Sequence, residues 1–178
     1  GGGIRSVEDI SNVLKSGADK VAINTAAIKN NKFIQEASQA IGSQSIIVSI
    51  EAKKINENYW EAYYDNGREK SGVNVLEWAK KSQELGAGEL LITSVDKEGL
   101  EKGMDIKLLK KIREIVNIPI IFSGGIGNID HILQTNEHAD GVALANVLHY
   151  EKFNIKSLKE ELIKKDINVR RDDFVWLP

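Results

Sequence analysis

Apolar positions along the chain alternate between two spacings, one typical of amphipathic helices and one typical of buried strands. In residues 8–18, Ile10, Val13 and Leu14 fall on one helical stripe. In residues 45–52, the run SIIVSIEA is rich in β-branched residues, which favours a buried strand. The same patterns predict helices at 31–42, 74–88, 105–116, 129–138 and 155–165, and strands at 19–24, 89–95, 118–125 and 141–146. Short strands that alternate with such helices predict successive βα units, a parallel sheet and an α/β fold.

Residues 53–72 interrupt this alternation. The aromatic stretch from Tyr59 to Tyr64 alternates in the manner of a strand, and it is followed by the turn sequence Asp65-Asn66-Gly67. We therefore expect a β-hairpin inserted at 53–72 within one domain that spans 1–178. The tail from Asn168 carries no helical pattern.

A glycine-rich turn occurs twice in the chain. The segment GGGIRSVED opens it and SGGIGNID covers residues 123–130, so that Gly124 follows Gly2 by 122 positions. Downstream, GADKVAIN is matched by HADGVALAN, with Asp19 opposite Asp140. A whole βαβ unit therefore recurs, at a distance of about half a (βα)8 barrel of about 250 residues.

Such turns can bind phosphate, because a glycine-rich turn after a strand exposes backbone N–H groups. A single glycine pair is more often a plain tight turn. The repetition, with Asn24-Thr25 after one copy and Ala145-Asn146 after the other, favours phosphate. Two such turns facing each other across a barrel mouth would hold a substrate with a phosphate at each end.

Composition narrows the class of protein. The 178 residues carry a formal net charge of −2, which gives no electrostatic support to non-specific nucleic-acid binding. The absence of cysteine excludes disulfides, thiolate metal sites and a cysteine nucleophile, and the three histidines lack metal-ligand spacing. No apolar run approaches the roughly 20 residues that span a bilayer. We expect no metal, no organic cofactor, no nucleic-acid or membrane partner, and a cytoplasmic location.

Four segments carry a specific resemblance: GADKVAINTAAI, GSQSIIVSIEAK, GAGELLITSVDKEG and IPIIFSGGIG. Together they resemble the cyclase subunit of imidazole glycerol phosphate synthase, a (βα)8 enzyme of the histidine pathway. The resemblance runs from Gly1 to about Arg170 and includes the inserted hairpin. It implies an α/β (βα)8 TIM barrel that is present here as an incomplete barrel, from the end of strand 3 to helix 8, without the first-strand catalytic aspartate.

The resemblance also implies a substrate. In that family it is an aminoimidazole carboxamide ribonucleotide with a phosphate at each end, and ammonia arrives from a partner glutaminase through the barrel. By resemblance, one phosphate would be bound by Gly3, Asn24 and Thr25. The other would be bound by Gly124, Gly125, Ala145 and Asn146, where the family usually has serine in place of Asn146. Thr93, Asp96 and Gly99 would belong to the same substrate site.

Two glutamates stand where the family has aspartates that take part in the reaction. Glu51 ends the strand IIVSI, and Glu98 follows the strand ELLITS. Each keeps the carboxylate but moves it by about one bond, and a misplacement of about 1 Å can cost on the order of 10²-fold in rate. The alternatives are a solvated strand-end acid for Glu51 and an ordinary charged loop for Glu98, where Asp96 could contribute equally.

Lys20 and Glu89 stand at the starts of their strands, so both are expected at the opposite, bottom face of the barrel. The resemblance places them at the charged gate where the glutaminase docks and ammonia enters; the alternative is an ordinary ion pair. Two other functions stay open. One is a related subunit that delivers ammonia in nucleotide-sugar (surface-glycan) amidation, and the other is a non-catalytic protein that only binds its glutaminase.

Overall fold

The computed structural model describes residues 1–151 and 154–170, so most of the tail after Asn168 lies outside the described residues. Five parallel strands pair side by side in chain order: β1 (Val21–Ile23), β2 (Ile46–Asn56), β5 (Glu89–Ser94), β6 (Ile120–Ser123) and β7 (Gly141–Ala143). Strands that pair in chain order indicate a sheet wound in one direction, as in a barrel. The predicted α/β fold with a parallel sheet is confirmed.

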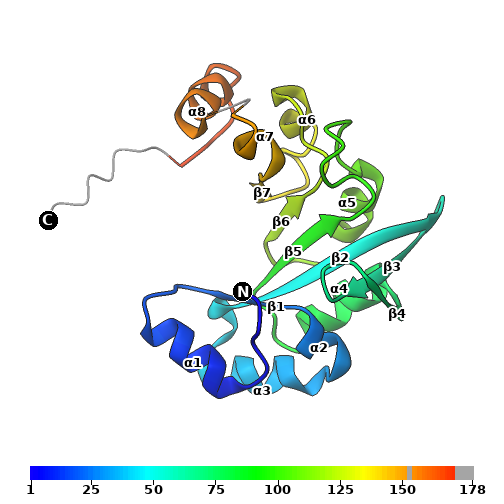
Figure 1. The fold of residues 1–178 in the computed structure, drawn as a ribbon, viewed down its shortest axis with the longest axis vertical. Coiled ribbons are helices and arrows are strands. Elements are labelled where there is room, and N and C mark those ends of the chain that lie inside the picture. The colour runs from blue at the N-terminus through cyan, green and yellow to red at the C-terminus, as the bar shows by residue number, and fades with distance from the viewer. Residues whose placement is uncertain (152–153, 171–178) are drawn as a thin grey trace, which may run out of the picture.

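Helices connect these strands and lie along one side of the curved sheet (Figure 1). The predicted helices are α1 (Val7–Lys15), α3 (Lys32–Ile41), α4 (Val75–Glu84), α5 (Ile106–Arg113), α6 (Ile129–Leu133) and α8 (Ile155–Lys164). Three short elements were not predicted: α2 (Thr25–Lys29), the 3₁₀ turn η1 (Ser43–Ser45) and α7 (Asn146–His149). Helices α2 and α7 begin two and three residues after β1 and β7 end, and the candidate phosphate-binding residues Asn24, Thr25, Ala145 and Asn146 lie at these two junctions.

The two faces of the sheet differ in burial. Along β2, Ile46, Val48 and Ile50 are fully buried, while the intervening Ser49 and Glu51 are half-buried. The buried residues belong to one hydrophobic core with helix residues such as Ile34 and Leu108. The helices therefore cover the outer face of the sheet, and the inner face carries the polar groups near the strand ends.

The sheet is an open arc in the described part of the chain. There, β1 makes its ladder with β2 and β7 with β6, and these two strands do not pair with each other. Figure 1 shows them at separate places along the arc. Among the helices of the described residues, none is long and apolar enough to cross a bilayer.

The inserted hairpin has different bounds from those predicted. Residues 53–56 continue β2, and the hairpin strands are β3 (Tyr59–Tyr64) and β4 (Glu69–Asn74). Asp65, Asn66 and Gly67 form the turn, all with positive φ (53°, 58° and 72°). The buried indole N–H of Trp60 donates to Asp105 Oδ2 at 2.8 Å, and Asp105 also caps α5. The hairpin is thereby fastened to α5 at the end of β2.

We predict an acid-sensitive cap directly after the first glycine turn. The backbone N–H of Arg5, followed by contacts from Ser6, lowers the pKa of Asp9 below its ordinary value. The folded state therefore favours the ionised carboxylate, and this contribution to stability is present above pH 4 and lost as the pH falls through the lowered pKa. Asp9→Asn should flatten the fall in unfolding free energy between pH 5 and pH 2, measured by urea titration. An unchanged acid limb would contradict the role of this cap.

Candidate active site

The sequence repeat reappears as a repeat of backbone conformation. Gly2 and Gly3 have φ of 82° and 70°, and Gly124 and Gly125 have φ of 99° and 95°. The residues that precede α2 and α7 also agree: φ and ψ are −127° and −82° at Asn24, and −130° and −69° at Ala145. These conformations at matching positions indicate two copies of one structural unit at the same rim, where the carboxyl ends of the parallel strands lie.

The first copy lines a hollow together with a candidate acid. Gly3, Asn24, Thr25 and Glu51 all border it. The hairpin turn fixes Glu51, because the N–H of Gly67 donates to Glu51 Oε2 at 2.7 Å. Two cationic residues, Arg5 and Lys29, also border this hollow, and Lys29 Nζ lies 4.9 Å from the centre of the Tyr64 ring. The hollow thus combines turn N–H groups, two cations and one positioned carboxylate.

Polar groups in the first hollow lack partners within the described residues. The backbone N–H groups of Gly3 and Thr25 donate to no other group there. Asn24 Oδ1 is buried without a hydrogen-bond partner, and Asn24 Nδ2 reaches Tyr63 O only at 3.4 Å. Unpaired polar groups at a strand end are typical of a site that binds a polar ligand.

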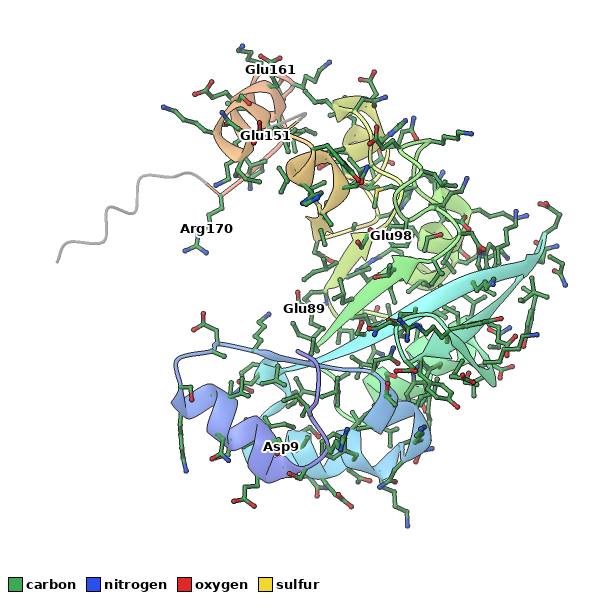
Figure 2. All side chains as sticks on the ribbon, in the orientation of Figure 1. Asp9, Glu89, Glu98, Glu151, Glu161 and Arg170 are labelled. Atoms are coloured by element: carbon green, nitrogen blue, oxygen red, sulfur yellow. The ribbon has the colours of Figure 1, made fainter. Side chains whose placement is uncertain are left out.

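The second copy lines a much smaller hollow with the other candidate acid, of about 10 Å³ against about 1180 Å³ for the first. It is bordered by Glu98, Gly99, Gly124, Gly125, Ala145 and Asn146. The backbone N–H groups of Gly125 and Asn146 donate to no other group among the described residues. Figure 2 shows Glu98 and Glu89 at opposite ends of β5. Each hollow therefore pairs one glycine turn with one glutamate at the same rim.

Thr93 and Asp96 lie outside the lining of both hollows. Thr93 stands between Glu51 and Ser123 in the strand register, so its backbone links the strands that end at the two hollows. Asp96 Oδ2 accepts a hydrogen bond from the backbone N–H of Lys54 at 2.5 Å. This contact ties Asp96 to the hairpin end of β2, which indicates a structural role for its carboxylate.

Lys20 and Glu89 meet at the opposite end of the sheet from the hollows. Lys20 Nζ donates to Glu89 Oε2. The Glu89 side chain is 9% exposed and that of Lys20 is 46% exposed. The pair bridges the start of β1 and the start of β5, on either side of β2. A buried carboxylate is therefore neutralised by a cation that is open to solvent.

Lys20→Met is expected to destabilise the protein more than Glu89→Gln. Lys20→Met leaves the buried Glu89 carboxylate without its cation, at a cost of about 1–3 kcal/mol. Glu89→Gln leaves only a half-exposed ammonium, which water can solvate, and should cost less than about 1 kcal/mol. Urea unfolding of both variants measures the difference, and equal losses would contradict this description of the pair.

Two contacts at the rim involve residues that sequence reasoning missed. Gly67 binds Glu51, as described above, and the carboxylate of Glu101 accepts a hydrogen bond from Asn146 Nδ2 at 2.5 Å. No pattern in the sequence signals either contact, because both depend on the paths of loops. Among the described residues, no group of three or more His, Cys, Asp and Glu side chains is placed to hold a metal ion.

Comparison with known proteins agrees with this geometry and confirms the resemblance noted above. Residues 1–154 match the protein family described as "Histidine biosynthesis protein". The chain is 46% identical over 171 residues to "Imidazole glycerol phosphate synthase subunit HisF" of Thermococcus onnurineus (strain NA1). That alignment covers 96% of this chain and 68% of the relative. The chain therefore belongs to the histidine biosynthesis protein family.

Proposed function

We propose that this protein is the cyclase subunit of an imidazole glycerol phosphate synthase, with an ammonia-dependent reaction at the rim that carries both hollows. The substrate would be an aminoimidazole carboxamide ribonucleotide with a phosphate at each end. The nitrogen of ammonia would enter a new imidazole ring, which gives imidazole glycerol phosphate. The rest of the substrate would leave as AICAR, a ribonucleotide with a single phosphate, together with one water. The observation that carries this proposal is the pair of hollows, each with its glycine turn and its glutamate.

The two ends of the substrate would be held mainly by backbone donors. At the first hollow these are the N–H groups of Gly3 and Thr25, with Asn24 beside them. At the second they are the N–H groups of Gly125 and Asn146, with Gly124 and Ala145 at the wall. Phosphate binds such turns because several N–H dipoles converge on one anion. With both ends bound, the reacting centre of the substrate would be held between the two hollows.

Glu51 and Glu98 would exchange protons with the reacting nitrogen and oxygen atoms. Ring closure requires that protons leave the incoming nitrogen and reach the departing groups, which is the work of a positioned acid and base. Glu51 lies on the inner face of β2, and Glu98 follows β5. Because the two strands are adjacent in the sheet, both carboxylates reach one substrate from neighbouring positions. Thr93 on β5 is the register partner of Glu51, and Gly99 shapes the wall of the second hollow.

A glutaminase would dock at the other end, where Lys20 and Glu89 pair, and would supply the ammonia in the cell. The Glu89 side chain is buried, so water does not fully solvate it. This position supports a role for Glu89 in a gate inside the barrel more than a role in a contact on the surface. The proposed setting is cytoplasmic, as expected for a small-molecule biosynthetic enzyme.

Turnover by the intact protein with the bisphosphorylated ribonucleotide and an ammonium salt tests the function. We expect imidazole glycerol phosphate and the carboxamide ribonucleotide in equal amounts, measured by chromatography. A nucleotide sugar with ammonium serves as the parallel substrate. Amidation of that sugar without cyclase turnover would replace this proposal with the glycan-amidating function. Inactivity with both substrates would favour a protein that only binds its glutaminase.

A further inference from the structure

The loop between β5 and α5 carries Glu98 and packs directly against the second glycine turn. The N–H of Gly103 donates to Gly125 O at 2.9 Å. A Cβ atom on Gly125 would lie 2.3 Å from Gly103 O, and one on Gly127 would lie 2.4 Å from Glu101 O. The glycines of this turn thus allow the loop to pack closely against the backbone of the turn. The position of the loop therefore depends on the position of the turn.

One side-chain contact completes this attachment. Asn146 Nδ2 donates to Glu101 Oε1 at 2.5 Å, which joins the start of α7 to the loop, 45 residues earlier in the chain. The backbone N–H of Asn146 makes no such bond among the described residues, and it borders the second hollow. Asn146 therefore has two different groups in two different places: a backbone donor at the hollow and a side-chain amide on the loop.

The other copy of the repeat shows a parallel arrangement. Thr25, which stands 121 positions before Asn146, accepts a hydrogen bond from the N–H of Asp65 through Oγ1 at 3.3 Å. Asp65 belongs to the hairpin turn whose Gly67 binds Glu51. Thr25, the first residue of α2, thus binds the hairpin turn that holds Glu51, and Asn146, the first residue of α7, binds the loop that carries Glu98.

We propose that Glu101 and Asn146 form a positioning pair, which sets the Glu98 loop relative to the second phosphate turn. The proposal rests on the proposed function in so far as it assigns Glu98 to proton transfer. Neither side chain of the pair touches the reacting atoms. Asn146 would bind phosphate through its backbone and align the acid through its amide, so that one residue links phosphate binding to the placement of Glu98.

Steady-state kinetics of the intact protein tests the pair. Glu101→Ala should lower kcat by about 10- to 100-fold through misplacement of Glu98, while KM for the bisphosphate changes less than about threefold. Asn146→Ala should do the same, and the double variant should be no worse than the worse single variant, because each of the three variants lacks the same hydrogen bond between Asn146 and Glu101. Glu101→Gln keeps an oxygen acceptor for Asn146 Nδ2 and should restore most of kcat. Lys102→Ala, an exposed change in the same loop, is the matched control.

Three results would overturn the inference. The first is a raised KM at unchanged kcat for Asn146→Ala, which would place the Asn146 amide on the phosphate. The second is a loss of kcat in the double variant that equals the sum of the two single losses in free energy. The third is a kcat of Glu101→Gln as low as that of Glu101→Ala.

A second measurement keeps the inference separate from the proposed function. If the wild-type protein turns over no ribonucleotide, the proposed function fails. Amide hydrogen exchange at Gly103 then tests whether Glu101 and Asn146 position the loop. Exchange should be about tenfold faster in Glu101→Ala than in wild type and near wild type in Glu101→Gln. Equal exchange rates in all three proteins would overturn the pair, whatever the substrate.

Discussion

Glu51→Gln is expected to reduce ammonia-dependent turnover by about 10²- to 10⁴-fold, because an amide cannot take up or release the proton at this position. The hydrogen bond from Gly67 can still form to the amide oxygen, so the hairpin should keep its place. The proposed phosphate-binding turns are untouched, and KM should stay within about twofold. Steady-state assays with saturating ammonium measure both constants. Glu84→Gln, on the exposed side of α4, is the matched control.

Glu51→Asp then shows how the site fits its side chain. Shortening the side chain withdraws the carboxylate from Gly67 by about one bond, and a displacement of about 1 Å can cost on the order of 10²-fold in rate. A large loss of kcat would show a site built around glutamate. Preserved or raised kcat would show a site that accepts the aspartate that the family resemblance implies at this position. Near-normal activity of Glu51→Gln would instead remove Glu51 from the reaction.

The second large effect separates two glycines that look alike in sequence. Gly3→Asp places a carboxylate in the first hollow, and repulsion of the phosphate should raise KM by about 10- to 100-fold. A Cβ on Gly3 meets nothing within 4 Å, so the only structural cost is the positive φ, about 1–2 kcal/mol. Gly125→Asp should instead destabilise the fold by about 3 kcal/mol or more, because its Cβ would lie 2.3 Å from Gly103 O.

Thermal unfolding and KM together measure this difference. Gly125→Asp should lower Tm by at least about 6–12 °C, and Gly3→Asp by about 2–8 °C. Gly17→Asp is the matched control, because Gly17 also has a positive φ (105°) and open space but lies outside both hollows. It should lose stability as Gly3→Asp does and leave KM unchanged. A normal KM in Gly3→Asp would remove the first phosphate site.

Hydrophobic spacing predicts most elements of this fold to within a few residues, because each is held by an apolar stripe that the sequence displays. The helix predicted at 31–42 is α3 at Lys32–Ile41, and its buried residues Phe33, Ile34 and Ala37 form the predicted stripe. The parallel order of the strands follows from the alternation of strands with helices. These features are local or nearly local, and one sequence is enough to find them.

The missed elements depend on contacts between distant segments. Helices α2 and α7 have five and four residues, too short for a periodic stripe or for stability on their own. Likewise, β2 continues through the mostly exposed residues 53–56 because β3 supplies a partner ladder, which the composition of these residues does not suggest.

The rim of the candidate site could be predicted in outline and not in detail. Strand ends place Glu51, Asn24 and Ala145 at one rim, and the repeat relates the two glycine turns. The difference between Gly3 and Gly125 is invisible in sequence, because the loop that covers Gly125 comes from residues more than twenty positions away. The engagement of Asn146 by Glu101 is hidden for the same reason.

Strand β2 has a further consequence for the motions of the protein. Its eleven residues make ladders with β1, β3 and β5, and its outer face is buried from Ile46 to Ala52. Amides so enclosed exchange with solvent only when the whole domain unfolds, whereas strands at the end of a sheet open in local fluctuations. The amides of Val48 and Ile50 should therefore report the global free energy of unfolding, and Glu51 is attached to the same enclosed strand. The chemistry proposed at the rim thus rests on a strand that should open only with the whole domain.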